Sequence, residues 1–267
     1  MPRASRHFLP GHVWHITHRC HRKQFLLKFV RDRRRWVHWL YKARKRFDLC
    51  VLNYVVTSNH IHLLVRDRGR GEIARSMQLI AGRTAQEHNL RRRRQGAFWQ
   101  DRYHATAVDT GAHLLRCMTY IDLNMVRAGV VSHPSQWEAG GYRQIQTPPP
   151  RYRIVDLEAL MDLCGIHKLE TLQATLAEWV TDALETNELR RESFWTESLA
   201  VGSHRFVDRI KEEVGIRLPS VTVRQRDGHC FLREAAEPYN AGFGGENGPV
   251  RAPEGSMGEN SGIPSGG

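Results

Sequence analysis

Residues 59–65 read Asn-His-Ile-His-Leu-Leu-Val and predict a β-strand, because residue types alternate along them. Successive side chains of a strand point to opposite faces, so His60 and His62 share one face. The apolar residues at 61, 63 and 65 are expected to pack inward, which leaves the two imidazoles side by side on an accessible face. Two neutral imidazoles on a rigid strand are a start for a divalent-metal site. The alternative is a pair of histidines on a solvated sheet face that bind nothing.

The segments that precede this strand predict its neighbours in an antiparallel sheet. Residues 51–56 are rich in β-formers, and only three residues separate them from the histidine strand, which indicates a hairpin. A first strand is predicted over residues 12–20. On it, His15 lies on one face, while His12 and His18 lie on the other, where surface or nucleic-acid-facing side chains are expected.

Two helices rich in arginine are predicted over residues 29–47 and 72–90, where apolar residues recur at near-helical spacing. The second runs into four arginines followed by an aromatic segment at 98–104. This stretch is either a solvated loop or a place for strand phosphates and stacked bases. In the second case the DNA-binding residues are Arg91, Arg92, Arg93, Arg94, Trp99 and Arg102.

A third helix is predicted to begin after Asp109 or Thr110, either of which can cap it, and to end at Gly129. Its apolar residues lie at helical spacing on one stripe that faces the core. The stripe consists of Leu114, Met118, Ile121 and Met125.

Tyr120 and Asn124 lie off this apolar stripe, one helical turn apart. Arg116 and Arg127 lie alongside them, so this face carries a phenol, an amide and two guanidiniums. A tyrosine off the core stripe is either a surface residue or a residue aimed at a ligand.

The composition predicts a soluble, cytoplasmic protein. The chain has 267 residues, of which 40% are hydrophobic, but it has no apolar run near the roughly 20 residues of a membrane span, and no secretory signal begins it. The five cysteines lie far apart without any Cys-x-x-Cys pair, so we expect reduced thiols.

Positive charge is concentrated in one half of the chain. Residues 1–150 contain 27 Lys and Arg against 9 Asp and Glu, a balance of +18, while the rest contains 13 against 19, a balance of −6. Most of the cations of the first half are arginines, which suit phosphates and bases. We therefore expect the first half to bind nucleic acid and the second half to stay away from it.

Three motifs occur in a distinctive order: His60-Ile61-His62, then Phe98-Trp99-Gln100-Asp101-Arg102-Tyr103, then Tyr120-Ile121-Asp122-Leu123-Asn124-Met125-Val126-Arg127-Ala128-Gly129. In this order and spacing, residues 8–145 resemble the single-tyrosine HUH transposases, particularly the REP-associated tyrosine transposases. The resemblance implies an α+β fold, a ferredoxin-like βαββαβ-type catalytic domain with an antiparallel sheet, that cuts and rejoins single-stranded, hairpin-associated DNA.

The resemblance also implies roles for individual residues. Tyr120 would be the nucleophile, His60 and His62 the metal ligands, and Asn124 a third ligand. A phenol has a pKa near 10, so nearby cations such as Arg116 and Arg127 would help its deprotonation. Two imidazoles and an amide favour a hard ion, Mg²⁺ or Mn²⁺, over tightly held zinc.

The chain changes character after the third helix. Residues 1–146 are expected to form the catalytic domain and 147–153, with three prolines, a stiff linker. A mostly helical accessory region is expected over 154–240, with short strands near Val221 and Phe231, and a disordered tail over 241–267. Because the second half is acidic, a chain ending near Gln146 is expected to keep DNA cleavage.

Two functions of different classes remain open at this stage. One is a DNA strand transferase and endonuclease, and the other is a non-catalytic DNA- or RNA-binding regulator on the same fold. The presence of all three catalytic positions favours the enzyme. Both a monomer and a homodimer agree with the sequence, and so do different DNA sites.

Overall fold

The structure is a computed structural model that describes residues 10–186, 189–215, 221–226 and 228–234. Within these residues one seven-stranded sheet has the strand order β2-β3-β1-β4-β5-β7-β6. The strands are β1 (Val13–Arg19), β2 (Cys50–Val56), β3 (His60–Arg66), β4 (His104–Val108), β5 (Ala200–Gly202), β6 (Val221–Arg226) and β7 (His229–Glu234). The helices are α1 (Val30–Phe47), α2 (Glu72–Arg92), α3 (Ala112–Asp122), α4 (Asn124–Arg127), α5 (Tyr142–Gln146), α6 (Leu157–Cys164), α7 (Leu169–Glu185), α8 (Phe194–Glu197) and α9 (His204–Gly215), with short 3-10 turns η1 (His21–Lys23) and η2 (Pro134–Gln136).

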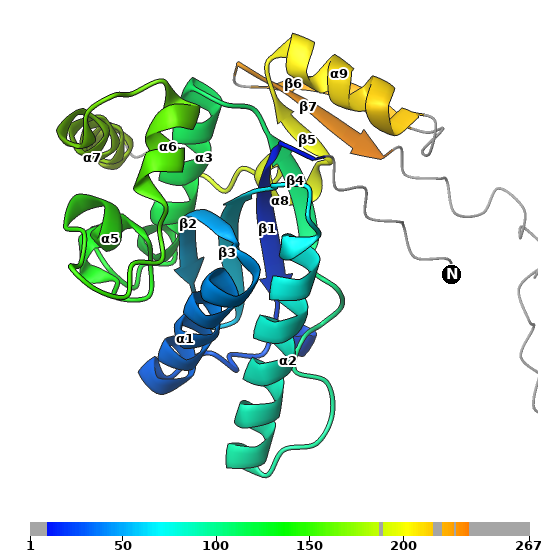
Figure 1. Cartoon of the computed structure of the whole chain (residues 1–267), viewed down its shortest axis with the longest axis vertical. Coiled ribbons are helices and arrows are strands. Elements are labelled where there is room, and N and C mark those ends of the chain that lie inside the picture. The colour runs from blue at the N-terminus through cyan, green and yellow to red at the C-terminus, as the bar shows by residue number, and fades with distance from the viewer. Residues whose placement is uncertain (1–9, 187–188, 216–220, 227, 235–267) are drawn as a thin grey trace, which may run out of the picture. The chain divides into compact units, whose positions relative to one another are not determined.

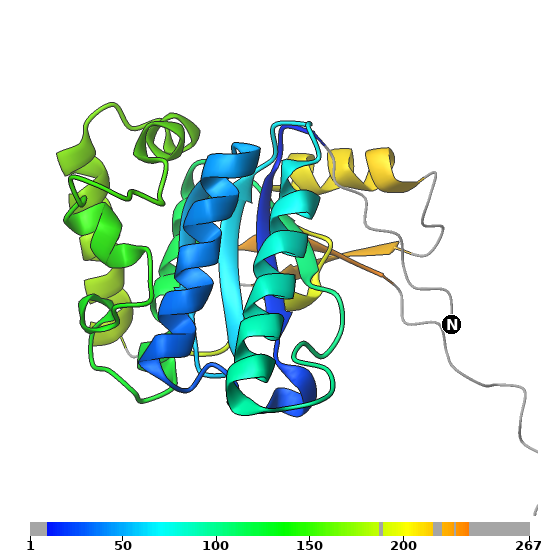
Figure 2. The same ribbon diagram turned by 60° about the horizontal axis from the view of Figure 1, so that its bottom comes forward.

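The first four strands and two helices follow one another as β1-α1-β2-β3-α2-β4, which confirms the predicted ferredoxin-like α+β fold. All neighbouring pairs among these strands are antiparallel. Helices α1 and α2 lie side by side over one face of the sheet (Figures 1 and 2). No helix in the described part of the chain is both long and apolar enough to cross a membrane.

The histidine strand, β3, lies inside the sheet, as the predicted hairpin requires. It pairs with β2 on one side and β1 on the other, and His62 lies opposite Val55 and Thr17. The side chains of Ile61, Leu63 and Val65 are fully buried, which confirms that this face packs inward.

The opposite face of β3 is also covered, and here the expectation of an accessible histidine face is wrong. Only 2% of His62 is exposed, because α3 and α8 pack over this face of the sheet. His60, at the start of β3, is partly exposed. The covering residues from α8 lie more than 130 positions after His62, so the local pattern carried no signal of them.

The helix that carries Tyr120 begins and continues differently from the prediction. It begins after Gly111, whose φ is 63°, and neither Asp109 nor Thr110 caps it. The carboxylate of Asp109 instead accepts hydrogen bonds from the backbone and hydroxyl of Ser203, at 3.0 and 2.7 Å. A contact with the distant Ser203, just before α9, therefore replaces the expected local cap.

Helix α3 ends at Asp122, and the short helix α4 follows after Leu123. Gly129, with φ of 66°, ends this region as predicted, since glycine adopts a left-handed conformation without strain. The predicted apolar stripe is buried throughout and consists of Leu114, Met118, Ile121 and Met125.

The C-terminal region adds strands to the sheet as well as helices. Strand β5 pairs with β4 in parallel, with Ala107 opposite Ala200, and β7 and β6 follow it at the edge. Residues up to Ala235 belong to one compact unit, so the proline segment at 147–153 separates no independent bodies among the described residues. The predicted tail at 241–267 lies outside the described residues.

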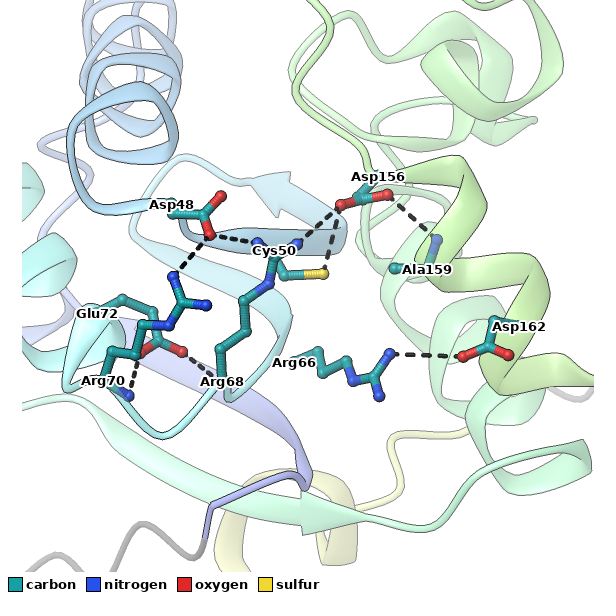
Figure 3. A network of polar contacts seen from close by, with 9 residues as sticks. All are labelled: Asp48, Cys50, Arg66, Arg68, Arg70, Glu72, Asp156, Ala159 and Asp162. Carbon is teal, nitrogen blue, oxygen red and sulfur yellow. Dashed lines mark hydrogen bonds and ion pairs between the residues drawn. The ribbon is translucent and has the colours of Figure 1, made fainter.

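Polar contacts fasten α6 to the end of the β2–β3 hairpin (Figure 3). The backbone N–H of Asp156 donates to Val51 O at 2.7 Å, and the Asp156 carboxylate caps the first turn of α6. Arg68 lies 3.4 Å from the same carboxylate, and Arg66 lies 3.5 Å from Asp162. Such exposed ion pairs contribute little energy each, so their main effect is to fix where α6 docks.

Candidate active site

His62 lies in a row of three hydrogen-bonded side chains beneath α3. Its Nδ1 is 2.8 Å from Nε2 of His15, and its Nε2 is 2.9 Å from Nδ2 of Asn124. The other nitrogen of His15, Nδ1, is 2.8 Å from the backbone carbonyl of Trp195 in α8. Strands β1 and β3 supply the two histidines, α4 supplies Asn124, and α8 supplies the carbonyl that His15 contacts.

The two ends of this row determine where its protons lie. A carbonyl only accepts, so His15 donates from Nδ1 and its Nε2 carries a lone pair. That lone pair accepts the Nδ1 proton of His62. Nε2 of His62 is then unprotonated, which agrees with its neighbour, because the amide nitrogen of Asn124 only donates.

In His60, as in His62, Nε2 carries no proton. Its Nδ1 donates to Oδ1 of Asn59 at 2.7 Å and lies 2.9 Å from the hydroxyl of Thr57, which leaves Nε2 as an acceptor. The ring centroids of His60 and His62 are 4.9 Å apart. Ligating histidines are commonly fixed in this way, by a hydrogen bond from the second ring nitrogen.

These residues fit a divalent ion as a two-histidine, one-amide set. Burial, with Arg19 and Arg191 next, lowers the pKa of His60 to about 4, and burial also lowers the pKa of His62 well below its usual value. Both rings are therefore neutral at pH 7 and able to ligate. Rotating the Asn124 amide by 180° presents Oδ1 to an ion. Among the residues that the structure describes, no three His, Cys, Asp or Glu side chains are grouped so that they could hold a metal ion.

Tyr120 lies against His62 and His15. Its ring centroid is 6.0 Å from that of His62 and 6.3 Å from that of His15, and only 6% of the residue is exposed. Tyr120 is thus buried although it lies off the apolar stripe, because Trp195 also packs against it, with ring centroids 6.3 Å apart. Of the two alternatives for an off-stripe tyrosine, the structure excludes the surface one.

Two arginines partly offset the effect of burial on the phenol, whose pKa stays above its usual value. Burial raises the pKa of Tyr120, while Arg127 and Arg191 lower it. The Arg127 guanidinium carbon is 4.2 Å from the ring centroid, and the guanidinium donates to the Tyr120 carbonyl at 2.5 Å. Arg116, expected in the same role, lies instead beside Gly228 at the β6–β7 turn.

Sequence reasoning missed three contributors to this site. His15 was noted only for its face of the strand, and Arg191 and Trp195 belong to the acidic half of the chain. The one usable signal was Phe194-Trp195, an aromatic pair in a polar stretch. Averaging charge over a whole half concealed a single arginine that lies at the site.

Comparison with known proteins finds one family model that matches part of the chain. Residues 10–124 match the family model described as "Transposase IS200 like". These residues, less than half of the chain, are thus similar to an IS200-like transposase domain. The domain contains His15, His60, His62, Tyr120 and Asn124, and ends before Arg127. The α8 residues that cover it lie outside the match.

Two solved structures are similar to the chain. One, "Structure of the REP associates tyrosine transposase bound to a REP hairpin", is 18% identical with a TM-score of 0.48, covering 58% of this chain and 94% of its own. The other, a putative transposase from Deinococcus radiodurans, is 13% identical with a TM-score of 0.32, covering 40% of this chain and 86% of its own. No curated protein matches the chain.

The four consecutive arginines of the IS200-like domain differ in their surroundings. Arg91 belongs to α2, which runs to Arg92 and is longer than predicted, and it pairs with the buried Asp32. Arg94 donates to the Ala97 carbonyl at 2.9 Å. Arg92 and Arg93 are exposed, so they remain the better candidates for phosphate contacts.

Trp99 and Arg102 lie at the end of the sheet where β3 begins. Trp99 bridges to Cys20, just after β1, and stacks on His18 with centroids 4.1 Å apart. Its Nε1 donates to the carbonyl of Ala81 at 3.0 Å, so part of the ring serves packing. Arg102 is exposed on the same segment.

The buried histidines predict a loss of stability in acid. Burial lowers the pKa of His15 to about 3 and that of His60 to about 4, so unfolded chains bind more protons between pH 6.5 and 4. The stability they contribute is present above pH 6.5 and is lost as the pH falls, by about 2–3 kcal/mol at pH 4.5 for a ring that stays neutral. Urea unfolding of metal-free protein at pH 6.5 and 4.5 measures this loss.

The control for this measurement removes Asp122, whose effect on stability has the opposite pH dependence. Burial raises the pKa of Asp122 to about 7, so its contribution is lost as the pH rises. In Asp122→Asn this term disappears, while the hydrogen bond from Asn53, 2.9 Å in the native chain, is retained. An unfolding free energy of Asp122→Asn that does not fall between pH 6.5 and 4.5 would contradict neutral buried histidines.

Proposed function

We propose that the chain is a strand transferase and endonuclease that cuts and rejoins single-stranded, hairpin-associated DNA through a 5′-phosphotyrosine on Tyr120. The observation that carries this proposal is the position of Tyr120, which packs against His62, the imidazole whose Nε2 carries no proton and which lies next to His60. The IS200-like domain supports transposase chemistry. The reaction sequence and the substrate are our inference.

In this proposal the phenol oxygen of Tyr120 attacks a backbone phosphorus. A Tyr–O–P bond forms, the P–O3′ bond breaks, and the phenolic proton passes to the departing 3′-oxygen. Arg127 and Arg191 stabilise negative charge on the phenol oxygen as the proton leaves. Attack by a 3′-hydroxyl on the phosphotyrosine reverses the step and joins strands, so no ATP is required.

His60, His62 and Asn124 would hold a divalent ion, Mg²⁺ or Mn²⁺. When bound there, the ion polarises the scissile phosphate and neutralises its charge. The hydrogen bonds from Nδ1 of each imidazole keep both Nε2 atoms available and hold the rings in place.

The substrate class is inferred from charge and aromatic side chains. Residues 1–150 carry a balance of +18, and exposed Arg92 and Arg93 lie on the segment that leads to Trp99. Arginines beside aromatic rings suit the phosphates and unstacked bases of single strands. We also infer a cytoplasmic location, where such DNA is present.

The direct test uses hairpin oligonucleotides with single-stranded flanks, labelled at the 5′ or the 3′ end, incubated with the protein and Mn²⁺ and separated on a denaturing gel. The transferase should yield cut strands, seen with the 5′ label, and a slowly migrating adduct that survives denaturant, seen with the 3′ label. The alternative, a non-catalytic DNA- or RNA-binding regulator on the same fold, predicts binding with neither product.

Replacing His60 tests the proposed metal site with little risk to folding, because His60 is partly exposed whereas His62 is buried. His60→Gln should reduce cleavage at least about a hundredfold, with DNA affinity and melting temperature nearly unchanged. His38→Gln, on α1 across the sheet, is the matched control and should behave as wild type. Full cleavage by His60→Gln would remove His60 from the site.

A further inference from the structure

We propose that His15 is a positioning residue for the metal ligand His62, and that the backbone of Trp195 fixes His15, so that the C-terminal region completes the metal site. The inference rests on the proposed function only for the identity of His62 as a ligand. The hydrogen-bonded row itself is a property of the fold.

The first support is the isolation of the His15–His62 pair from water. His15 is 0% exposed and His62 is 2% exposed, and their rings stack with centroids 5.0 Å apart and planes 20° apart. A buried imidazole nitrogen without a partner would cost free energy, so the 2.8 Å bond between them is maintained. Neither ring can turn without breaking it.

The second support is the direction of the bond. His15 accepts from His62 because its own proton is held by Trp195 O at 2.8 Å. If His15 carried its proton on Nε2, that proton would face the proton on Nδ1 of His62. His62 would then have to carry its proton on its own Nε2, the nitrogen proposed to ligate the metal. The carbonyl of Trp195 therefore selects the tautomer of two histidines in succession.

The third support is that the carbonyl of Trp195 is itself held rigidly. The Trp195 side chain is 0% exposed, and its Nε1 donates to Glu192 at 2.8 Å. Phe194 beside it stacks on Phe231, with centroids 5.6 Å apart. Strand β5, which begins five residues later at Ala200, pairs with β4 in the same sheet. The anchor is thus part of the sheet assembly.

His15 is excluded as a third ligand in this arrangement. Its Nε2 lone pair already accepts the proton of His62, and Nδ1 carries the proton given to Trp195. Replacing His15 should consequently weaken metal binding indirectly, because the ring of His62 becomes free to turn. A side chain of similar length that accepts a hydrogen bond should restore the affinity.

The test is performed on the full chain labelled with ¹⁵N-histidine. In metal-free wild type at pH 7.5, NMR should show His62 protonated on Nδ1 and bare on Nε2. His15→Leu should lose this preference and bind Mn²⁺, measured by electron paramagnetic resonance, about 10- to 100-fold more weakly. His15→Gln keeps a hydrogen-bond acceptor and should stay within a few-fold of wild type.

His12→Gln, before the same strand, is the matched control and should leave the His62 tautomer and Mn²⁺ affinity unchanged. If His15→Leu fails to fold, the tautomer of His62 in wild type and the Mn²⁺ affinity of His15→Gln still test the proposal. An Nε2-protonated His62 in wild type, or equal Mn²⁺ affinity in wild type and folded His15→Leu, would overturn the proposal. If Tyr120 forms no adduct while the tautomer result holds, the strand-transfer function fails and this inference stands.

Discussion

Tyr120→Phe should abolish the covalent protein–DNA adduct, a loss of at least about a thousandfold, because the substitution removes the only atom that can form the phosphotyrosine. The ring remains in place between Trp195 and the two histidines, so folding and most DNA affinity should be retained. Oligonucleotides labelled at the 3′ end show the adduct on a denaturing gel, and peptide mapping should place it on Tyr120.

Tyr41→Phe provides the control for this experiment. Tyr41 lies on α1 and contacts Tyr152 at its edge, so its hydroxyl is remote from the histidines and adduct formation should be unchanged. An adduct that persists in Tyr120→Phe would mean another nucleophile. Failure of wild type to form one with any hairpin substrate and Mn²⁺ would leave the binding-regulator function.

A chain that ends at Gln146 is expected to lose the folded state, which reverses the expectation from charge alone. Strand β5 pairs with β4, and the backbone N–H of Ala107 donates to Leu199 O at 2.8 Å. Leu160, Leu172 and Trp195 of the second half are fully buried. Removing them also exposes to water the apolar surfaces on which they pack. Each large apolar side chain contributes about 1.5–3 kcal/mol, against a total stability of about 5–15 kcal/mol.

Circular dichroism melting and gel filtration of the 1–146 chain measure this effect. We expect aggregation, or no cooperative transition and no adduct. A chain that ends at Ala235 keeps every described residue and should melt as the full chain does. A cooperative melt together with DNA cleavage by the 1–146 chain would show that the second half is dispensable.

Features that depend on short-range patterns could be predicted from the sequence. The alternation in residues 59–65 and the three-residue link before them predicted an inner strand of a hairpin, and the structure confirms it. Helical spacing likewise predicted the buried stripe of α3. The grouping of His60, His62 and Tyr120 came from the order of motifs, since periodicity relates only residues within one element.

Only the tertiary structure decided what surrounds these residues. The burial of His62, the bond from His62 to His15 and the Trp195 carbonyl that anchors it depend on contacts between residues up to 180 positions apart. Net charge assigned the acidic half no part in the site, although Arg191 lies near enough to Tyr120 to lower its pKa. Charge summed over a segment averages out single residues, and a strand pattern shows which side chains share a face without showing what packs against that face.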